Sequence, residues 1–206
     1  MVIKAANEFK DKTTAINQLW QTDFTYLKIT GWGWYYLSTV LDDFSRYIVA
    51  WRLGPTMCAS DVTATLDQAL AALDLDSATV VHRPRLLSDN GASYVAGDLA
   101  DWLEDKGMQH VRGAPCHPQT QRKIDCWHQT LKNRILLENY YLPGDLDRVI
   151  GVFVERYNHI RYHESIDTVT PADVYFGRAQ TILAERRRSR LATIANRRLQ
   201  HRLQAA

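Results

Sequence analysis

The chain begins with strand-like runs in which apolar and polar residues alternate. Residues 19–29 and 34–41 are rich in Trp, Tyr, Thr and branched aliphatic residues, which favour β-strands. Gly31-Trp32-Gly33 marks a turn between them. A third strand is predicted over residues 47–53, after a turn at 42–46. Because the connections are short, these three strands are expected to form an antiparallel meander.

The rest of the chain has two short strand-like runs and several stretches with helical spacing. The runs Leu86-Leu87 and 108–111 predict the fourth and fifth strands. Apolar residues at helical spacing, together with capping and stop signals, predict helices over residues 60–73, 96–106, 119–139, 146–157, 171–175 and 180–204. This order predicts an α/β fold with a mixed five-stranded sheet flanked by helices.

The charge pattern divides the chain unevenly. We predict a loosely ordered leader over residues 1–17, a core over 18–177 and an arginine-rich helical tail over 178–206. Eight of the 25 basic residues, but one of the 23 acidic residues, lie from Arg178 onward, so the tail is near +7 and the rest near −5. A segregated basic helix indicates a polyanion partner such as nucleic acid. On charge alone, a solvated basic helix explains the pattern equally well.

The composition excludes several classes of protein. A hydrophobic fraction of 46% and a charged fraction of 23% are ordinary for a globular domain. No run of 18 apolar residues predicts a membrane span, and the first residues lack the apolar segment of a signal peptide. Cys58, Cys116 and Cys126 form no CxxC pair, so we expect reduced thiols, neither a disulfide framework nor a zinc site. A cytoplasmic protein without a membrane partner is therefore expected.

Three aspartates stand where metal-binding carboxylates would be expected. Asp23 lies inside the apolar run of the first strand, where a carboxylate is costly unless something pairs with it. Asp89 follows the fourth strand, and Asp125 comes after a further 35 residues, near the start of a predicted helix. These elements can meet at one edge of the sheet. Magnesium, which prefers carboxylate and phosphate oxygens, would pair with such a cluster.

The helix that carries Asp125 shows two neighbouring stripes of side chains. The stripe predicted to face the sheet is apolar and consists of Ile124, Trp127, Leu131 and Ile135. The stripe beside it is polar and consists of Asp125, His128, Gln129 and Lys132. We interpret the polar stripe as facing the site, with its later members continuing along a DNA backbone. An ordinary solvated helix face is the alternative.

Eight short motifs occur in an order that is typical of one family. They are Trp20–Tyr26, Asp42–Arg46, Ser88–Gly91, His117–Thr120, Trp127–Lys132, Tyr157-Asn158, Arg161–His163 and Thr170–Tyr175. With these motifs, the chain from Trp20 to Gly177 resembles the catalytic core of retroviral-type integrases and of the insertion-sequence transposases that share it. The resemblance implies a ribonuclease-H-like fold. It also implies DNA cleavage and strand transfer by an Asp-Asp-Glu triad with two magnesium or manganese ions.

The resemblance assigns the three aspartates their roles. Asp23 and Asp89 match the first two triad members, and Asp125 occupies the third position, where the family has glutamate. The family also usually has glycine in place of Arg122 and a basic or aromatic residue in place of Cys126. Aspartate is one methylene shorter than glutamate, and a misplacement of about 1 Å can cost on the order of 100-fold in rate. The triad is thus either weakened or conditionally active, or it is inactive.

The implied chemistry is an in-line displacement at phosphorus, assisted by two metal ions. Asp23 would bridge both ions, Asp89 would hold one and Asp125 the other. Water would first free a 3′-hydroxyl, which would then attack target DNA. The residues expected to contact DNA are His117, Gln119, Arg122, Lys123, Gln129, Lys132, Arg186, Arg187 and Arg188.

Some of these residues have a second interpretation. His117 could be an ordinary loop histidine, and Arg122 could instead occlude space that DNA must enter. Asp42 and Asp43, in a hairpin turn, are interpreted as structural. Trp32, between glycines, could be an exposed contact.

Three functions remain open from the sequence. The first is the catalytic core of a DNA transposase, a polynucleotidyl transferase that joins element ends to target DNA. It is expected to work as a homodimer or larger assembly. Its expected location is the bacterial cytoplasm, at the nucleoid when it is bound to DNA. The second is an inactive DNA-binding or assembly remnant. The third, a simple ribonuclease-H-like nuclease, is disfavoured by the motifs outside the triad. Because the first twenty residues contain no helix-turn-helix or zinc motif, recognition of DNA ends is expected to depend on a segment or subunit outside this sequence.

Overall fold

The structure is a computed structural model, and it describes residues 3–4, 13–73, 83–112 and 121–204. Its strands are β1 (Ile3–Lys4), β2 (Leu19–Ile29), β3 (Gly33–Asp42), β4 (Ile48–Gly54), β5 (Arg85–Ser88) and β6 (His110–Arg112). Its helices are α1 (Ala59–Ala72), α2 (Ala92–Val95), α3 (Gly97–Asp105), α4 (Arg122–Ile135), α5 (Pro143–His159), α6 (Pro171–Tyr175) and α7 (Ala179–Gln204), with a 3-10 turn at Glu164–Ile166. None of the described helices is long and apolar enough to cross a membrane.

The strands form one mixed sheet in the order β1-β6-β5-β2-β3-β4. β2, β3 and β4 are the predicted antiparallel meander, while β5, β6 and β1 run parallel to β2. The predicted α/β class and five-stranded mixed sheet are therefore confirmed. The sequence did not predict β1, which adds two residues at the edge beside β6.

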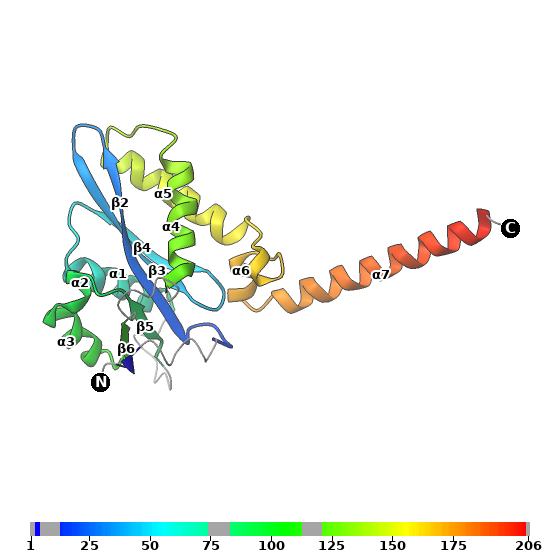
Figure 1. The fold of residues 1–206 in the computed structure, drawn as a ribbon, viewed down its shortest axis with the longest axis horizontal. Helices are drawn as coiled ribbons and strands as arrows, with labels where there is room; N and C mark the ends of the chain where they lie inside the picture. The colour runs from blue at the N-terminus through cyan, green and yellow to red at the C-terminus, as the bar shows by residue number, and fades with distance from the viewer. Residues whose placement is uncertain (1–2, 5–12, 74–82, 113–120, 205–206) are drawn as a thin grey trace.

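Helices cover both faces of the sheet (Figure 1). On one face, α4 and α5 bury an apolar cluster against β2, β3 and β4, with Trp127 fully buried at its centre. On the other face, α1 and α3 pack around Trp20, Val40 and Leu86. Because β2 and β3 contribute alternate residues to the two clusters, each face of these strands is fixed by a different set of helices.

Two helices begin earlier than predicted because of their capping groups. α1 follows Cys58, whose backbone N–H donates to the Asp61 carboxylate at 3.1 Å, so the aspartate lies inside the first turn. α5 begins at Pro143, since proline is well suited to the first helical position. The capping box predicted at Thr170 and Asp173 is confirmed, with Asp173 N donating to Thr170 Oγ1 at 3.1 Å.

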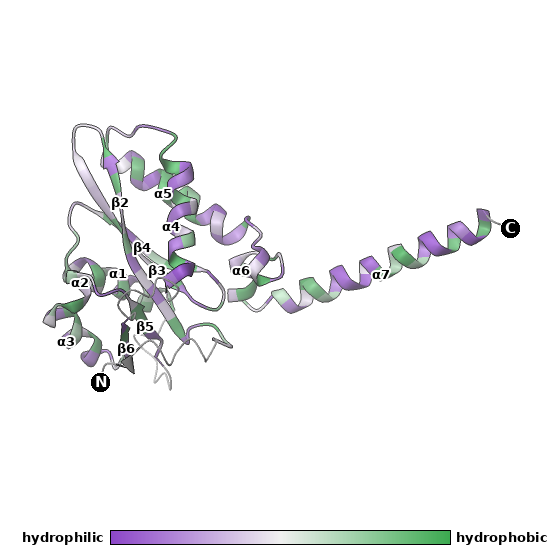
Figure 2. Ribbon diagram, in the orientation of Figure 1, coloured by the Kyte–Doolittle hydropathy of each residue, from purple (hydrophilic) through white to green (hydrophobic). Residues whose placement is uncertain are grey.

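α7 extends away from the other elements as an exposed helix of 26 residues, and none of its side chains is buried (Figure 1). Hydrophilic and hydrophobic residues are interspersed along it (Figure 2). Near its start, the Arg186 guanidinium donates to the Thr168 carbonyl oxygen at 2.8 Å and lies over the Tyr162 ring. The predicted helical tail is thus present and is tied to the core near its first turns.

Candidate active site

The first two aspartates lie where two parallel strands separate. Among the residues that the structure describes, β2 and β5 pair only through Leu19–Gln21 and Arg85–Leu87. Continuing this register by two residues brings Asp89, the residue after β5, opposite Asp23. The sequence expectation that these two carboxylates meet at one edge of the sheet therefore agrees with the strand register.

α4 carries the third aspartate over the same part of the sheet. The Trp127 indole N–H lies 3.4 Å from Thr39 Oγ1, and Thr39 is the cross-strand partner of Asp23. The predicted apolar stripe is confirmed, because Ile124, Trp127, Leu131 and Ile135 are all buried. Asp125, two residues before Trp127, lies at the exposed side of the first helical turns.

The Asp23 carboxylate influences the pKa values of both Asp89 and Asp125. Partial burial raises the pKa of Asp89; the Gly91 N–H opposes this, and the Asp23 carboxylate raises it further. Partial burial also raises the pKa of Asp125, again reinforced by Asp23 and opposed by His128. The fold thus brings all three predicted ligands within electrostatic range of one another through Asp23.

His128 contacts Asp23 directly. Its Nδ1 lies 3.5 Å from Asp23 Oδ2, and its side chain is 9% exposed. Its Nε2 is buried and has no hydrogen-bond partner among the described residues. Since His128 follows Asp125 by three residues, the two side chains are neighbours one turn apart on α4. The packed imidazole therefore restricts where the Asp23 carboxylate can point.

The Asp89 carboxylate is held by its own loop. The Gly91 backbone N–H donates to Asp89 Oδ1 at 2.8 Å, a local turn of the kind that aspartate favours. A Cβ atom added at Gly91 would meet Asp89 Oδ1 at 2.9 Å. A side chain at position 91 would therefore require the Asp89 carboxylate to shift.

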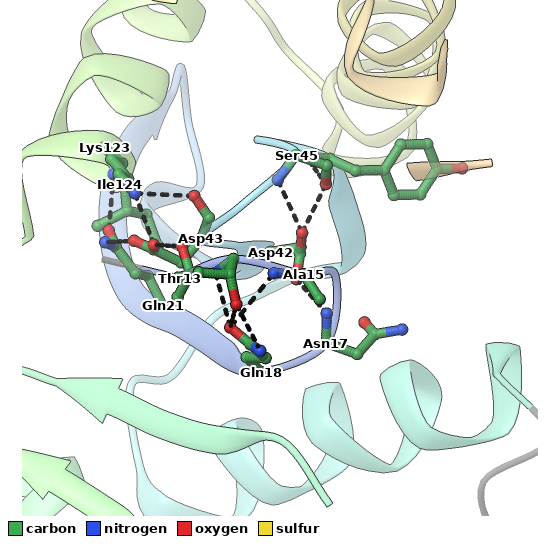
Figure 3. A network of polar contacts seen from close by, with 12 residues as sticks. Thr13, Ala15, Asn17, Gln18, Gln21, Asp42, Asp43, Ser45, Lys123 and Ile124 are labelled. Carbon is green, nitrogen blue, oxygen red and sulfur yellow. Dashed lines mark hydrogen bonds and ion pairs between the residues drawn. The ribbon is translucent and has the colours of Figure 1, made fainter. Parts of the chain in front are cut away.

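A buried polar network fixes the start of α4 against β2 (Figure 3). Gln21, two residues before Asp23, accepts the Ile124 backbone N–H at 3.1 Å and donates to Asp43 Oδ1 at 2.8 Å. The Lys123 ammonium donates to Asp43 Oδ2 at 2.5 Å and to the Asp43 carbonyl oxygen at 2.8 Å. Because Asp125 comes directly after these anchored residues, the network sets its position relative to Asp23.

The neighbouring Asp42 binds the chain that precedes β2 (Figure 3). Its carboxylate accepts the Asn17 N–H at 2.7 Å and both the N–H and the hydroxyl of Ser45. Burial raises the pKa of Asp42, although these hydrogen bonds oppose the change. Thr13 similarly donates to Asp43 at 2.6 Å. The structural interpretation of Asp42 and Asp43 fits these contacts, and residues 13–17 of the predicted leader are ordered by them.

The three aspartates offer the type of donor atom that a divalent cation binds. Asp23, Asp89 and Asp125 offer hard carboxylate oxygens, and magnesium usually takes only one or two carboxylates besides waters and substrate phosphates. Within the described ranges, no group of three or more His, Cys, Asp or Glu side chains is close enough to enclose a metal by itself. A cation at Asp23 would therefore complete its coordination with waters or with a bound substrate.

The residues expected to contact DNA fall into three groups. His117 and Gln119 lie outside the described residues. Arg122, Gln129, Arg187 and Arg188 are exposed, while Lys132 is half-buried with its Nζ 4.2 Å from the centroid of the Tyr26 ring. Lys123 and Arg186 already have partners in Asp43 and Thr168. For these last two, a structural role competes with the predicted contact to DNA.

Family comparison agrees with this arrangement. A family model described as "Integrase core domain" matches residues 13–118, and a second with the same description matches residues 106–171. The chain belongs to the integrase core domain family. Asp23 and Asp89 lie inside the first matched region, and Asp125 lies inside the second.

Several curated relatives of this integrase core are transposases. The transposase for insertion sequence element IS904 of Lactococcus lactis is 27% identical over 164 residues, which cover 79% of this chain and 62% of the relative. The transposase for insertion sequence element IS629 of Shigella sonnei is 28% identical over 158 residues, covering 76% and 51%. This integrase core therefore spans about half to three-fifths of the length of these relatives.

Solved structures share the fold of this integrase core. An intasome of simian T-cell lymphotropic virus superposes with a TM-score of 0.67 at 21% identity, covering 80% of this chain and 56% of the other. The catalytic core domain of HTLV-2 integrase, in complex with magnesium, superposes with a TM-score of 0.59 at 18% identity, covering 79% and 98%. The ribonuclease-H-like architecture implied by the resemblance is confirmed.

Sequence reasoning missed the positioning contacts of this integrase core. His128 was placed in the polar stripe but not in the site, although its spacing of three residues from Asp125 was the available signal. Gln21 was not singled out, because nothing local distinguishes it from a polar residue on a half-exposed strand. Its role depends on contacts with residues that are 22 and 103 positions away.

Proposed function

We propose that this chain is the catalytic core of a DNA transposase that cleaves DNA and joins a freed 3′-hydroxyl to a target strand. The observation that carries the proposal is the convergence of Asp89 and Asp125 on Asp23, at the open edge of β2. The family membership and the transposase relatives support it. We infer polynucleotidyl transfer, with element ends and target DNA as substrates.

The three carboxylates would hold two magnesium or manganese ions at this edge. When bound, such ions supply positive charge that activates the attacking oxygen and stabilises the leaving one. Asp23, restrained by His128, would contribute to both positions, while Asp89 and Asp125 would each complete one. Partial burial, reinforced by the Asp23 carboxylate, raises the pKa values of Asp89 and Asp125, and a bound cation would lower both.

DNA would approach the site along exposed parts of α4 and α7. On α4, Arg122 lies one turn before Asp125, and Gln129 and Lys132 lie one and two turns beyond it. Phosphate contacts there would fix the register of the strand. Arg187 and Arg188 add exposed charge on α7. His117 and Gln119 belong to the same proposal. We also propose that the chain works as a homodimer or larger assembly, a possibility that the dimeric and trimeric forms of the HTLV-2 core support.

A second candidate function is a DNA-binding remnant that has lost catalysis. The observation that favours it is aspartate at position 125, where the shorter side chain lies on the exposed side of α4. This remnant would keep the fold and the basic helix. It would bind DNA in a salt-dependent manner without cutting it under any metal condition.

A cleavage and joining assay distinguishes the two functions. Purified protein is incubated with labelled DNA carrying the element's ends, with manganese or with a chelator. The transposase proposal predicts nicked and joined products with manganese, and none with the chelator or with Asp23→Asn. Binding of the same DNA without products in manganese would instead establish the remnant. In a parallel reaction with an RNA·DNA hybrid, cleavage of the hybrid alone would indicate the simple nuclease.

A further inference from the structure

The β2–β3 hairpin exposes three large aromatic side chains. Tyr26 is 57% exposed, Trp34 is 52% exposed and Trp32, at the turn, is 59% exposed. Trp20 and Trp127, by contrast, are fully buried in the two clusters that hold the sheet. The exposure of Trp32 agrees with its interpretation as an exposed contact. Large aromatic side chains that are exposed close together indicate a binding surface when neighbouring side chains suit the same ligand.

Two of these rings and one ammonium group form a compact surface. Tyr26 and Trp34 meet edge to face, with ring centroids 5.3 Å apart. Lys132 reaches from α4 to place its Nζ 4.2 Å from the centroid of the Tyr26 ring. Lys28, also exposed, is the cross-strand partner of Trp34. The surface therefore combines aromatic rings with two cations, which suits a ligand that has both flat rings and negative charge.

This surface lies beside the catalytic carboxylates. Tyr26 follows Asp23 by three residues on β2, or about 10 Å along a strand, so the two side chains leave opposite faces of the strand. The contact between Lys132 of α4 and Tyr26 joins the two faces beyond Gln21, where the described β2–β5 pairing ends. Lys132 follows Asp125 by seven residues on α4, or about 10 Å along a helix. Both paths end at the contact between Lys132 and Tyr26. The distance from the carboxylates to this contact is therefore about 10 Å along either element. Nucleotides in a stacked strand are about 3.4 Å apart, so this distance corresponds to roughly three nucleotides.

We propose that Tyr26, Trp34 and Lys132 bind an unpaired base of the DNA strand about three nucleotides from the phosphate that is cut. The aromatic faces would stack on a base of any identity, while Lys132 would hold the adjoining phosphate. A base inside a duplex is already stacked on its neighbours and cannot use these rings. The inference rests on the proposed function for the nature of the ligand. It adds that the DNA must be unpaired at this point.

Binding to metal-free protein tests the surface independently of catalysis. Fluorescence anisotropy is measured in EDTA with a labelled thymidine oligonucleotide of about 15 nucleotides and with a blunt duplex of equal length. Tyr26→Ala and Trp34→Ala should each weaken binding of the unpaired strand by about 5- to 100-fold, the range of one lost stacking contact. Duplex affinity should change less than about twofold, since stacked bases do not use the rings. Tyr26→Phe, which keeps the ring, should bind like the wild type.

Two further variants separate this inference from the proposed function. Asp23→Asn removes a negative charge near the strand and should bind the unpaired strand at least as tightly as the wild type, although it should cleave nothing. If no protein cleaves DNA while Tyr26→Ala still weakens binding of the unpaired strand, the surface stands and the proposed function falls. An unchanged affinity in Tyr26→Ala, or equal losses on both DNAs, overturns the inference. A change of oligomeric state in Trp34→Ala, measured by sedimentation, would overturn it in favour of an interface between copies.

Discussion

Replacing Asp125 by glutamate should raise the rate of DNA cleavage by about 100-fold, because the longer side chain lets the carboxylate reach about 1 Å further from the helix backbone. The increase should be larger with magnesium than with manganese, since magnesium is strict about octahedral geometry. Single-turnover cleavage of intact DNA by the wild type and by Asp125→Glu, measured in each metal, gives the rate ratio for magnesium and the rate ratio for manganese. α4 needs no rearrangement for this change, because Asp125 lies at the exposed side of the helix.

The control for this prediction keeps the length of the side chain and removes its charge. Asp125→Asn should cut more slowly than the wild type in both metals. If Asp125→Glu is no faster than the wild type while Asp125→Asn is equally active, residue 125 takes no part in the chemistry. Activity in Asp125→Glu alone would instead show that the aspartate makes the native chain inactive.

Replacing Asp43 by alanine should lower the free energy of unfolding by about 3 kcal/mol, the range found when one partner of a buried ion pair is removed. The Asp43 side chain is 8% exposed, and its loss would leave the Lys123 ammonium without its carboxylate. Gln21 and Thr13 would each lose a hydrogen bond as well. Urea unfolding followed by tryptophan fluorescence measures the change.

Two controls show whether this cost comes from the network. Asp145→Ala removes a carboxylate from an exposed pair with Arg148, where the atoms are 4.0 Å apart, and should cost less than about 0.5 kcal/mol. Combining Asp43→Ala with Lys123→Met should recover part of the loss, because no unpaired charge remains. An Asp43→Ala protein as stable as Asp145→Ala would contradict the role of the network in fixing α4.

The sequence could predict those parts of the fold that depend on local periodicity. Residues of β2 and β3 alternate between two apolar clusters, and α4 places Ile124, Trp127 and Leu131 on one face. Both patterns can be counted along the chain without knowing what packs against them. The Thr170 capping box is equally local, which is why its helix began at the predicted residue.

The parts that could not be predicted depend on contacts between distant residues. β1 has two residues and exists only because β6, more than 100 positions later, pairs with it. Asp43 joins Lys123 across 80 positions, so a turn-like aspartate gave no sign of anchoring α4. The contact between His128 and Asp23 likewise requires the packing of α4 on β2. Spacing suggested which carboxylates meet, but tertiary contacts decide how each is held.

The central claim is that Asp23 is the common ligand of a divalent metal site completed by Asp89 and Asp125. The most direct measurement is a calorimetric titration of metal-free protein with manganese, in the wild type, Asp23→Asn and Asp125→Glu. We predict that the wild type binds manganese, that Asp125→Glu binds it more tightly and that Asp23→Asn loses the binding. Equal binding of manganese by the wild type and Asp23→Asn would contradict the claim.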